Sequence, residues 1–173
     1  MSQQPTIIVP ARLESTRLKR KLLYEVEGKP LIIWTAERIS SEVPEFPLFF
    51  AVDSKELADC LKTYSYEVIM TNKKHSSGTD RIAEANKSIK AEFVINIQAD
   101  EPLIHRSQIK LLANSLEAGH SMSTLATIFV NPDDFYNPNC VKVVVGNNRQ
   151  ALYFSRAPIP YVRDLKGAVA TDW

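Results

Sequence analysis

Cysteine is scarce in this sequence. The 173 residues include two, Cys60 and Cys140, and they give neither the framework of a disulfide-rich secreted domain nor the paired spacing of a structural zinc site. The N-terminus has no basic stretch followed by a long apolar core, and no apolar run approaches the ~18 residues of a membrane span. We therefore expect a cytoplasmic protein with no secretory signal and no membrane insertion.

An excess of charge is missing too. The formal net charge is +1, so no global field favours nucleic acid or an anionic membrane. Five basic residues gather in one loop, between Arg12 and Lys21, without an aromatic platform, which also argues against a nucleic-acid partner. The glycine-rich phosphate loop of Walker ATPases and the Gly-x-Gly-x-x-Gly of Rossmann dehydrogenases are both absent, so neither class is indicated.

The composition that remains is that of an ordinary globular protein, with 45% hydrophobic and 24% charged residues. The length predicts a single domain over residues 1–173. Short apolar runs alternate with helical periodicity, which predicts an α/β fold: a mostly parallel, mixed sheet sandwiched by helices, with an antiparallel hairpin near the end. The expected strands are residues 6–9, 48–52, 67–70, 93–97, 122–129, 141–145 and 151–154. The expected helices begin at Pro30, after the N-cap candidates Ser54 and Thr79, and at about Ser107, and a short helical turn covers 133–136.

A basic loop follows the first predicted strand. Arg12, Ser15, Arg17 and Lys21 lie between two apolar runs, beyond the carboxyl end of that strand. Ligands of open α/β sheets bind in the crevice at those strand ends. Guanidinium groups, an ammonium group and a hydroxyl suit a polyphosphate, which spreads several negative charges. Taken alone, a basic loop is more often a solvated surface, so the interpretation depends on the segments that follow.

A second polar segment runs from His75 to Arg81 and contains Ser77, Gly78 and Thr79. A glycine beside small hydroxyl residues at a helix start lets a flat base or a phosphate approach the backbone closely. The alternative is that these residues do only what any loop entering a helix requires, and the segment alone favours that alternative. By itself His75 is typical of a surface residue rather than a catalyst.

A third polar segment comes directly after the most apolar strand and includes Gln98, Asp100 and Glu101. A carboxylate at the end of a buried strand, facing a basic loop, is suited to hold Mg²⁺, which prefers one or two protein carboxylates together with waters and substrate phosphates. Asp100 is our choice for the metal ligand. The alternative is that Asp100 or Glu101 caps the next helix.

Together the segments resemble one family. The chain is similar to 3-deoxy-manno-octulosonate cytidylyltransferases, the CMP-KDO synthetases of Gram-negative bacteria, from about Thr6 to Asp164. Each motif alone is weak, but six of them occur in order with family-like spacing. The first motif consists of residues 10–12, residues 15–18 and Lys21. The other five are residues 28–31, 75–81, 96–102, 137–142 and 151–156.

The resemblance implies a nucleotide-diphospho-sugar transferase (Rossmann-like) fold and the reaction of CTP with KDO to CMP-KDO and pyrophosphate, for lipopolysaccharide biosynthesis. It further implies a role for each matching residue. Arg12, Ser15, Arg17 and Lys21 would meet the triphosphate, with Arg12, Lys21 and Asp100 as the catalytic set. Ser77, Gly78 and Arg81 would lie near cytosine and ribose, Gln98 and Arg156 would contact the sugar acid, and Asp100 would hold the Mg²⁺ cofactor.

The chain departs from the family at three places. Leu-Pro-Gly-Lys of the first loop is Leu18-Lys19-Arg20-Lys21 here, which changes the stiffness of the loop and adds charge. Gln-Gly-Asp-Glu-Pro is Gln98-Ala99-Asp100-Glu101-Pro102, and Ala99 would be strained at positive φ, although we expect it to be tolerated. Family members also continue beyond the equivalent of Trp173, with further KDO contacts, dimer contacts and a second metal-binding Asp. We therefore expect a truncated chain and leave a family-like homodimer open.

Three alternatives remain open at this point. The chain could be a nucleotide-binding domain without turnover, because the second metal-binding carboxylate of the family has no counterpart here. The same chemistry also serves acylneuraminate and 8-amino-KDO, and the sequence does not distinguish these sugar acids from KDO.

Overall fold

The computed structural model describes residues 4–15 and 18–161. Contacts divide the chain into two compact units, Met1–Thr124 and Leu125–Trp173, and each is described by itself. The single domain over residues 1–173 that the length predicts therefore stays a prediction.

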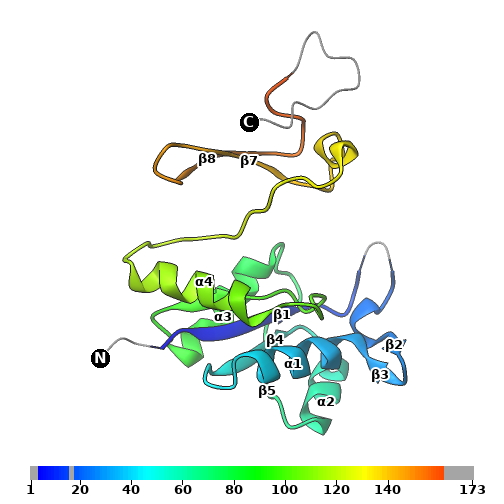
Figure 1. The fold of residues 1–173 in the computed structure, drawn as a ribbon. Coiled ribbons are helices and arrows are strands. Elements are labelled where there is room, and N and C mark those ends of the chain that lie inside the picture. The colour runs from blue at the N-terminus through cyan, green and yellow to red at the C-terminus, as the bar shows by residue number, and fades with distance from the viewer. Residues whose placement is uncertain (1–3, 16–17, 162–173) are drawn as a thin grey trace. The chain divides into compact units, whose positions relative to one another are not determined.

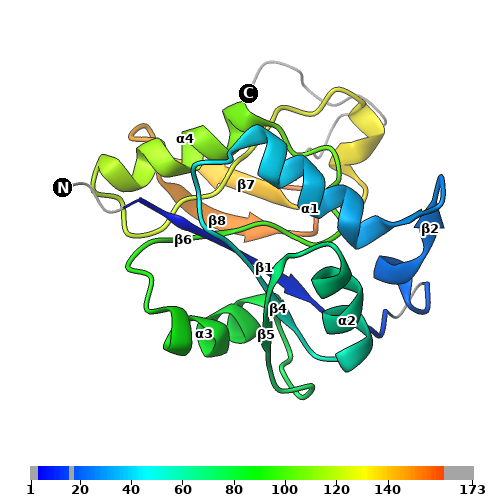
Figure 2. The same ribbon diagram turned by 90° about the horizontal axis from the view of Figure 1, so that it is seen from below.

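A four-stranded parallel sheet forms the centre of the first unit. Its order is β5 (Glu67–Met70), β4 (Leu48–Val52), β1 (Thr6–Ala11) and β6 (Val94–Asn96), so β1 is flanked on both sides (Figure 2). All six residues of β1 are buried. A strand of a parallel sheet that is covered on both faces has this continuous apolar run, so the predicted sheet is confirmed in this unit.

The helices pack on both faces of this sheet. Ile7 and Val9 of β1 belong to the main core, together with apolar residues of α1 (Leu31–Glu42), α2 (Lys55–Thr63) and α4 (Arg106–Glu117). Ile8 points to the opposite face, where it packs with α3 (Gly78–Ile89). These helices are labelled along the chain in Figure 1. Each fully buried apolar side chain contributes about 1.5–3 kcal/mol to this packing.

The connections explain where a ligand site can form. The chain leaves β1 for β4 on one side, and it returns through β5 and α3 to β6 on the other. This reversal of strand order between β1 and β6 is the topological switch point of an open α/β sheet. In addition, β6 pairs only with Thr6–Ile8 of β1. Val9–Ala11 of β1 therefore extend beyond the last residue that is paired with β6, and the two strands diverge there.

Two helix caps differ in their agreement with the sequence. Ser54 caps α2 as predicted, because its side chain accepts a hydrogen bond from the N–H of Leu57 at 3.2 Å. The prediction of Thr79 as the cap of α3 is wrong: Ser77 has extended backbone angles and accepts from the N–H of Asp80 at 3.1 Å, so the helix already begins at Gly78. Both hydroxyl residues suit a cap, and the backbone of the loop decides between them.

The basic loop ends in a short 3₁₀ helix, η1 (Lys21–Leu23), followed by a small hairpin of β2 (Glu25–Val26) and β3 (Lys29–Pro30). Glu27 and Gly28 have φ of 52° and 76°, the combination that tight hairpin turns require. Arg20, just before η1, also lies in the left-handed region, with φ 56° and ψ 30°. In the Leu-Pro-Gly-Lys pattern of the family that the sequence resembles, this position corresponds to the glycine.

The second unit contains η2 (Pro132–Phe135) and the antiparallel pair β7 (Lys142–Val145) and β8 (Ala151–Ser155). The predicted hairpin is confirmed, and its turn is closed by the N–H of Gly146, which donates to the carbonyl of Gln150 at 2.9 Å. The buried ammonium group of Lys142 donates to the carbonyls of Asn137, Cys140 and Arg156. These bonds connect the hairpin to the turn that precedes it.

The strand predicted for residues 122–129 is not formed. Met122 and Ile128 are exposed, and the segment has no ladder partner within residues 4–15 and 18–161. Apolar and β-branched residues favour a strand only where a neighbouring strand and a core accept them. Among the described residues, no helix is long and apolar enough to cross a membrane.

The backbone at Arg20 gives a testable prediction. A left-handed conformation is costly for a residue with a Cβ and free for glycine, so Arg20→Gly is expected to raise the free energy of unfolding by about 0.5–1 kcal/mol. Lys19→Gly is the matched control, because Lys19 is not among the described residues with positive φ. This substitution should lower the free energy of unfolding by about the same amount. Denaturant unfolding at high salt, which screens the exposed ion pair of Arg20 with Glu56, measures both. Equal changes in the free energy of unfolding for Arg20→Gly and Lys19→Gly would contradict this prediction.

A second prediction concerns acid stability. Glu45, in the connection between α1 and β4, accepts from Lys110 and Arg106 of α4 at 2.7 Å each. The bond from Lys110, the backbone bond at Glu45 and the bond from Arg106 together lower the pKa of Glu45 from 4.5 to about 2. Its contribution is therefore complete above pH 4.5 and lost as the pH falls towards 2. The difference in unfolding free energy between wild type and Glu45→Gln should shrink over that interval in parallel denaturation series. A difference that does not change with pH would refute this.

Candidate functional site

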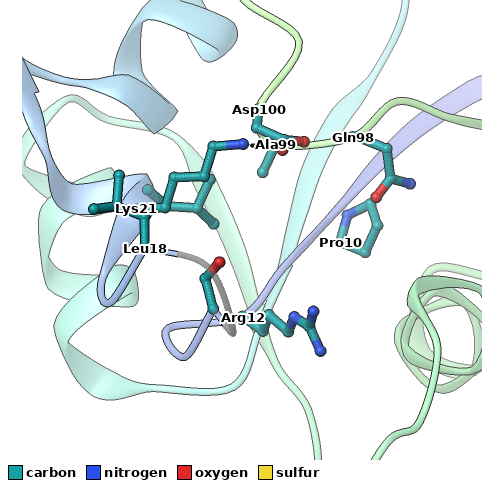
Figure 3. A pocket seen from close by; sticks show the side chains of 9 residues that line it. Pro10, Arg12, Leu18, Lys21, Gln98, Ala99 and Asp100 are labelled. Atoms are coloured by element: carbon teal, nitrogen blue, oxygen red, sulfur yellow. Dashed lines mark hydrogen bonds and ion pairs between the residues drawn. The ribbon is translucent and has the colours of Figure 1, made fainter. Parts of the chain in front are cut away.

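Two adjoining cavities lie where β1 and β6 end. The first has a volume of about 340 Å³ and the second of about 190 Å³. Pro10, Arg12 and Gln98 line both of them. In Figure 3, Lys21 approaches the first cavity from one side while Pro10 and Gln98 lie on the other. The site is therefore divided in two, with a common wall made by residues at and beyond the ends of β1 and β6.

An ion pair crosses the first cavity. The Lys21 ammonium group donates to the Asp100 carboxylate at 2.6 Å, and both side chains are about 40% exposed (Figure 3). Such an exposed pair contributes little to stability, since water screens it. Its importance is chemical, because it shows that the basic loop brings a cation within contact of the carboxylate that follows β6. Arg12 and Ser15 line the same cavity.

The position of Asp100 is set by a buried hydrogen bond beside it. The hydroxyl of Thr35, fully buried in α1, donates to the carbonyl of Ala99 at 2.9 Å, and the N–H of Glu101 donates to the carbonyl of Gln98 at 3.2 Å. Ala99 itself is buried and is not among the described residues with positive φ. Alanine is thus compatible with this turn, as expected from the sequence.

The alternative in which a carboxylate after β6 caps the next helix is wrong. α4 is capped by His105, whose ring nitrogen accepts a hydrogen bond from the N–H of Ser107. In turn, the N–H of His105 donates to the side-chain oxygen of Gln108 at 2.8 Å. Asp100 and Glu101 lie too early in the chain to do this. Asp100 remains available to the cavity, and Lys21 is its partner.

The second cavity is bounded by the start of α3. A Cβ added at Gly78 would lie 3.1 Å from Cγ of Pro10 and 3.7 Å from Nε2 of Gln98. Glycine is therefore favoured at this position, because the helix start packs tightly on the end of β1 and a Cβ would crowd Pro10. The group that lies close to Gly78 in the described structure is Pro10, and the approach of a base or a phosphate stays a prediction.

The hydroxyl groups of Ser76 and Ser77 also stabilise the start of α3. Ser77 donates to the Asp80 carboxylate at 2.7 Å and accepts from its N–H, and Ser76 donates to the same carboxylate at 3.1 Å. The bonds from Ser77 and then Ser76 lower the pKa of Asp80. His75 lines the cavity, but its ring is held by Glu84. Ser77 thus caps α3, and it also belongs to the wall of the second cavity.

Arg81 is the buried cation of the second cavity. It is 3% exposed, and its guanidinium donates to the Thr71 hydroxyl at 2.6 Å and to the Asp53 carboxylate at 3.3 Å. Sequence reasoning placed Arg81 here but missed Asp53. The signal was present, because Asp53 directly follows the buried strand β4, just as polar residues follow β6.

The structure thus gathers most of the predicted residues in the first unit. Arg12, Ser15, Lys21, Gln98 and Asp100 line the first cavity, while Ser77, Gly78 and Arg81 line the second. Arg17 lies outside the described residues. Arg156 belongs to the second unit, where its guanidinium donates to the carbonyl of Pro138 at 2.7 Å.

Comparison with known proteins gives a consistent result. The family model described as Cytidylyltransferase matches residues 6–169. The 3-deoxy-manno-octulosonate cytidylyltransferase of Chloroherpeton thalassium is 44% identical over 91% of this chain and 66% of its own length. That of Neisseria meningitidis is 41% identical over 91% of the chain and 64% of its own length. The chain therefore spans about two thirds of the length of these curated relatives.

Solved structures agree. A structure of CMP:2-keto-3-deoxy-manno-octonic acid synthetase complexed with CTP superposes with a TM-score of 0.83 at 34% identity, covering 93% of this chain and 67% of the other. A cytidylyltransferase from Leptospira borgpetersenii, at 16% identity and a TM-score of 0.59, shares the fold. From the family model, the identities and this superposition, the chain belongs to the 3-deoxy-manno-octulosonate cytidylyltransferase family.

Proposed function

We propose that this chain binds CTP across the two cavities and transfers its cytidylyl group to KDO, releasing pyrophosphate. One observation carries the proposal: a cavity lined by cations and a carboxylate adjoins a smaller cavity at a helix start, and the two share Pro10, Arg12 and Gln98. A nucleotide has the same two parts, a charged triphosphate and a flat base with its ribose. The names of the relatives support the choice of CTP and KDO.

The first cavity suits the triphosphate. Arg12 offers a planar fork of donors, Lys21 offers a compact positive charge and Ser15 offers a hydroxyl. In this proposal Lys21 exchanges its partner Asp100 for phosphate oxygens when the nucleotide enters. Arg17 follows in the same loop and has the same assignment from the resemblance.

The second cavity suits cytosine and ribose. Ser77 and Gly78 bring backbone close to the end of β1, and Arg81 supplies a guanidinium that is already fixed by Thr71 and Asp53. A group that is immobilised before binding loses less entropy when the ligand binds. Gln98 stands between the cavities, and we assign it and Arg156 to the sugar acid.

The residues present fit Mg²⁺ as a shared site. The described chain contains no cluster of three or more His, Cys, Asp or Glu side chains that could enclose an ion. Asp100 already faces a cation, and Mg²⁺ favours one or two carboxylates completed by waters and phosphate oxygens. Asp100 would hold the ion, which when bound would neutralise charge on the transferring phosphate.

The chain's own groups then act by position and charge. Arg12 and Lys21 hold the triphosphate so that the α-phosphorus faces the anomeric hydroxyl of KDO. The new bond joins that oxygen to the α-phosphorus while the bond to pyrophosphate breaks, and the hydroxyl proton leaves to solvent. Cations around the departing pyrophosphate stabilise the charge that develops on it.

The test is pyrophosphate release by the 173-residue chain. We expect release from CTP only when both Mg²⁺ and KDO are present, and its loss on addition of EDTA. Asp100→Ala should reduce the rate at least ~100-fold, because the metal contributes several kcal/mol to the transition state. Glu101→Ala, the adjacent exposed carboxylate, is the matched control and should retain most of the rate.

Parallel reactions test the alternatives. N-acetylneuraminate and 8-amino-KDO replace KDO in separate assays, and equal release with either would reassign the sugar acid. CTP binding without release under any of these conditions would contradict the proposed transfer by this chain and favour a nucleotide-binding domain without turnover.

A further inference from the structure

The strongest unassigned feature is the carboxylate of Asp53, which directly follows β4 and is 8% exposed. It lines neither cavity, yet it touches one residue from each side of the site. One oxygen accepts from the N–H of Leu13 at 2.9 Å, and the other accepts from the Arg81 guanidinium at 3.3 Å. Leu13 follows Arg12 at the beginning of the basic loop, whereas Arg81 lies in the first turns of α3.

The rest of the network returns to the sheet. The hydroxyl of Thr71 accepts from Arg81 at 2.6 Å and donates to the carbonyl of Val52 at 2.9 Å, and the N–H of Thr71 reaches the same carbonyl at 2.8 Å. Among the described residues, no buried side-chain nitrogen or oxygen lacks a partner. A fully satisfied buried network fixes its members in one arrangement, whereas a buried charge that loses its partner is costly.

The chemistry requires a carboxylate here. Asp53 accepts from two donors in two different elements, and one of those donors is charged. An asparagine of the same shape has one acceptor oxygen, and its amide nitrogen would face a donor. It could therefore satisfy Leu13 or Arg81, but not both.

We propose that Asp53 is a positioning residue that couples the two halves of the nucleotide site. It holds the start of the basic loop through Leu13 and orients Arg81 in the wall of the second cavity. This inference rests on the proposed function, because it assigns the two cavities to one nucleotide. It predicts that loss of the carboxylate weakens ligand binding at both ends, including the phosphate end, which Asp53 does not line.

The experiment measures binding and stability separately for Asp53→Asn. Calorimetric titrations use CTP and inorganic tripolyphosphate as probes, at a temperature well below the melting temperature of every variant. We expect the Kd for CTP to rise at least ~10-fold, since a charge-assisted bond is lost. The Kd for tripolyphosphate should rise at least ~3-fold through the displaced loop. Asp59→Asn, an exposed aspartate of α2, is the matched control and should leave both values unchanged.

A second variant separates the two ends. Arg81→Lys keeps a cation beside Asp53 but gives up the planar fork. It should raise the Kd for CTP at least ~3-fold and leave that for tripolyphosphate unchanged, because the bond to Leu13 persists. This contrast also carries the test if Asp53→Asn does not fold.

The outcomes are distinct. A lower melting temperature of Asp53→Asn with unchanged affinities would make Asp53 a purely structural residue and overturn the inference. Unchanged tripolyphosphate binding with weaker CTP binding would remove the coupling. Unchanged CTP binding by Arg81→Lys would also overturn it. Failure of the wild-type chain to bind CTP would instead refute the proposed function.

Discussion

The parallel pairing of β1 with β4 on one side and β6 on the other is the constraint on which the site depends. It places the carboxyl ends of these strands at one edge of the sheet, so that polar residues distant in sequence converge there. Burial of Ile7, Ile8 and Val9 stabilises this pairing from both faces. Because β6 pairs only as far as Ile8, the ends diverge, and the two cavities lie on either side of Pro10, Arg12 and Gln98.

Much of this could be predicted from the sequence, because the strongest signals are local. The continuous apolar run of β1 indicates a strand that is covered on both faces, and Asp100 in the polar segment after β6 indicates a carboxylate at the ligand edge. Motif resemblance added the family, which the comparisons confirm. The roles of individual site residues remain proposals.

Other features depend on tertiary structure that periodicity does not encode. Thr79 and Ser77 are equally suitable caps by residue type, and the extended backbone at Ser77 decides between them. Residues 122–129 have strand propensity but no ladder partner in the part of the chain that the structure describes. Asp53 could be recognised as the end of a strand, but its two bonds, to Leu13 and Arg81, exist only because β1 and α3 both pack against β4. The preference for glycine at position 78 likewise follows from the approach of Pro10.

The central claim is that the edge formed by the ends of β1 and β6 binds CTP. Amide NMR of the isotopically labelled chain, titrated with CTP and Mg²⁺, tests it most directly, since it locates binding without requiring turnover. We expect saturable changes in amide chemical shift that are concentrated at Arg12, Lys21, Gly78, Gln98 and Asp100. The changes near Thr6 and Val94, at the opposite end of the sheet, should be small. Absence of saturable shifts, or shifts centred away from these residues, would contradict it.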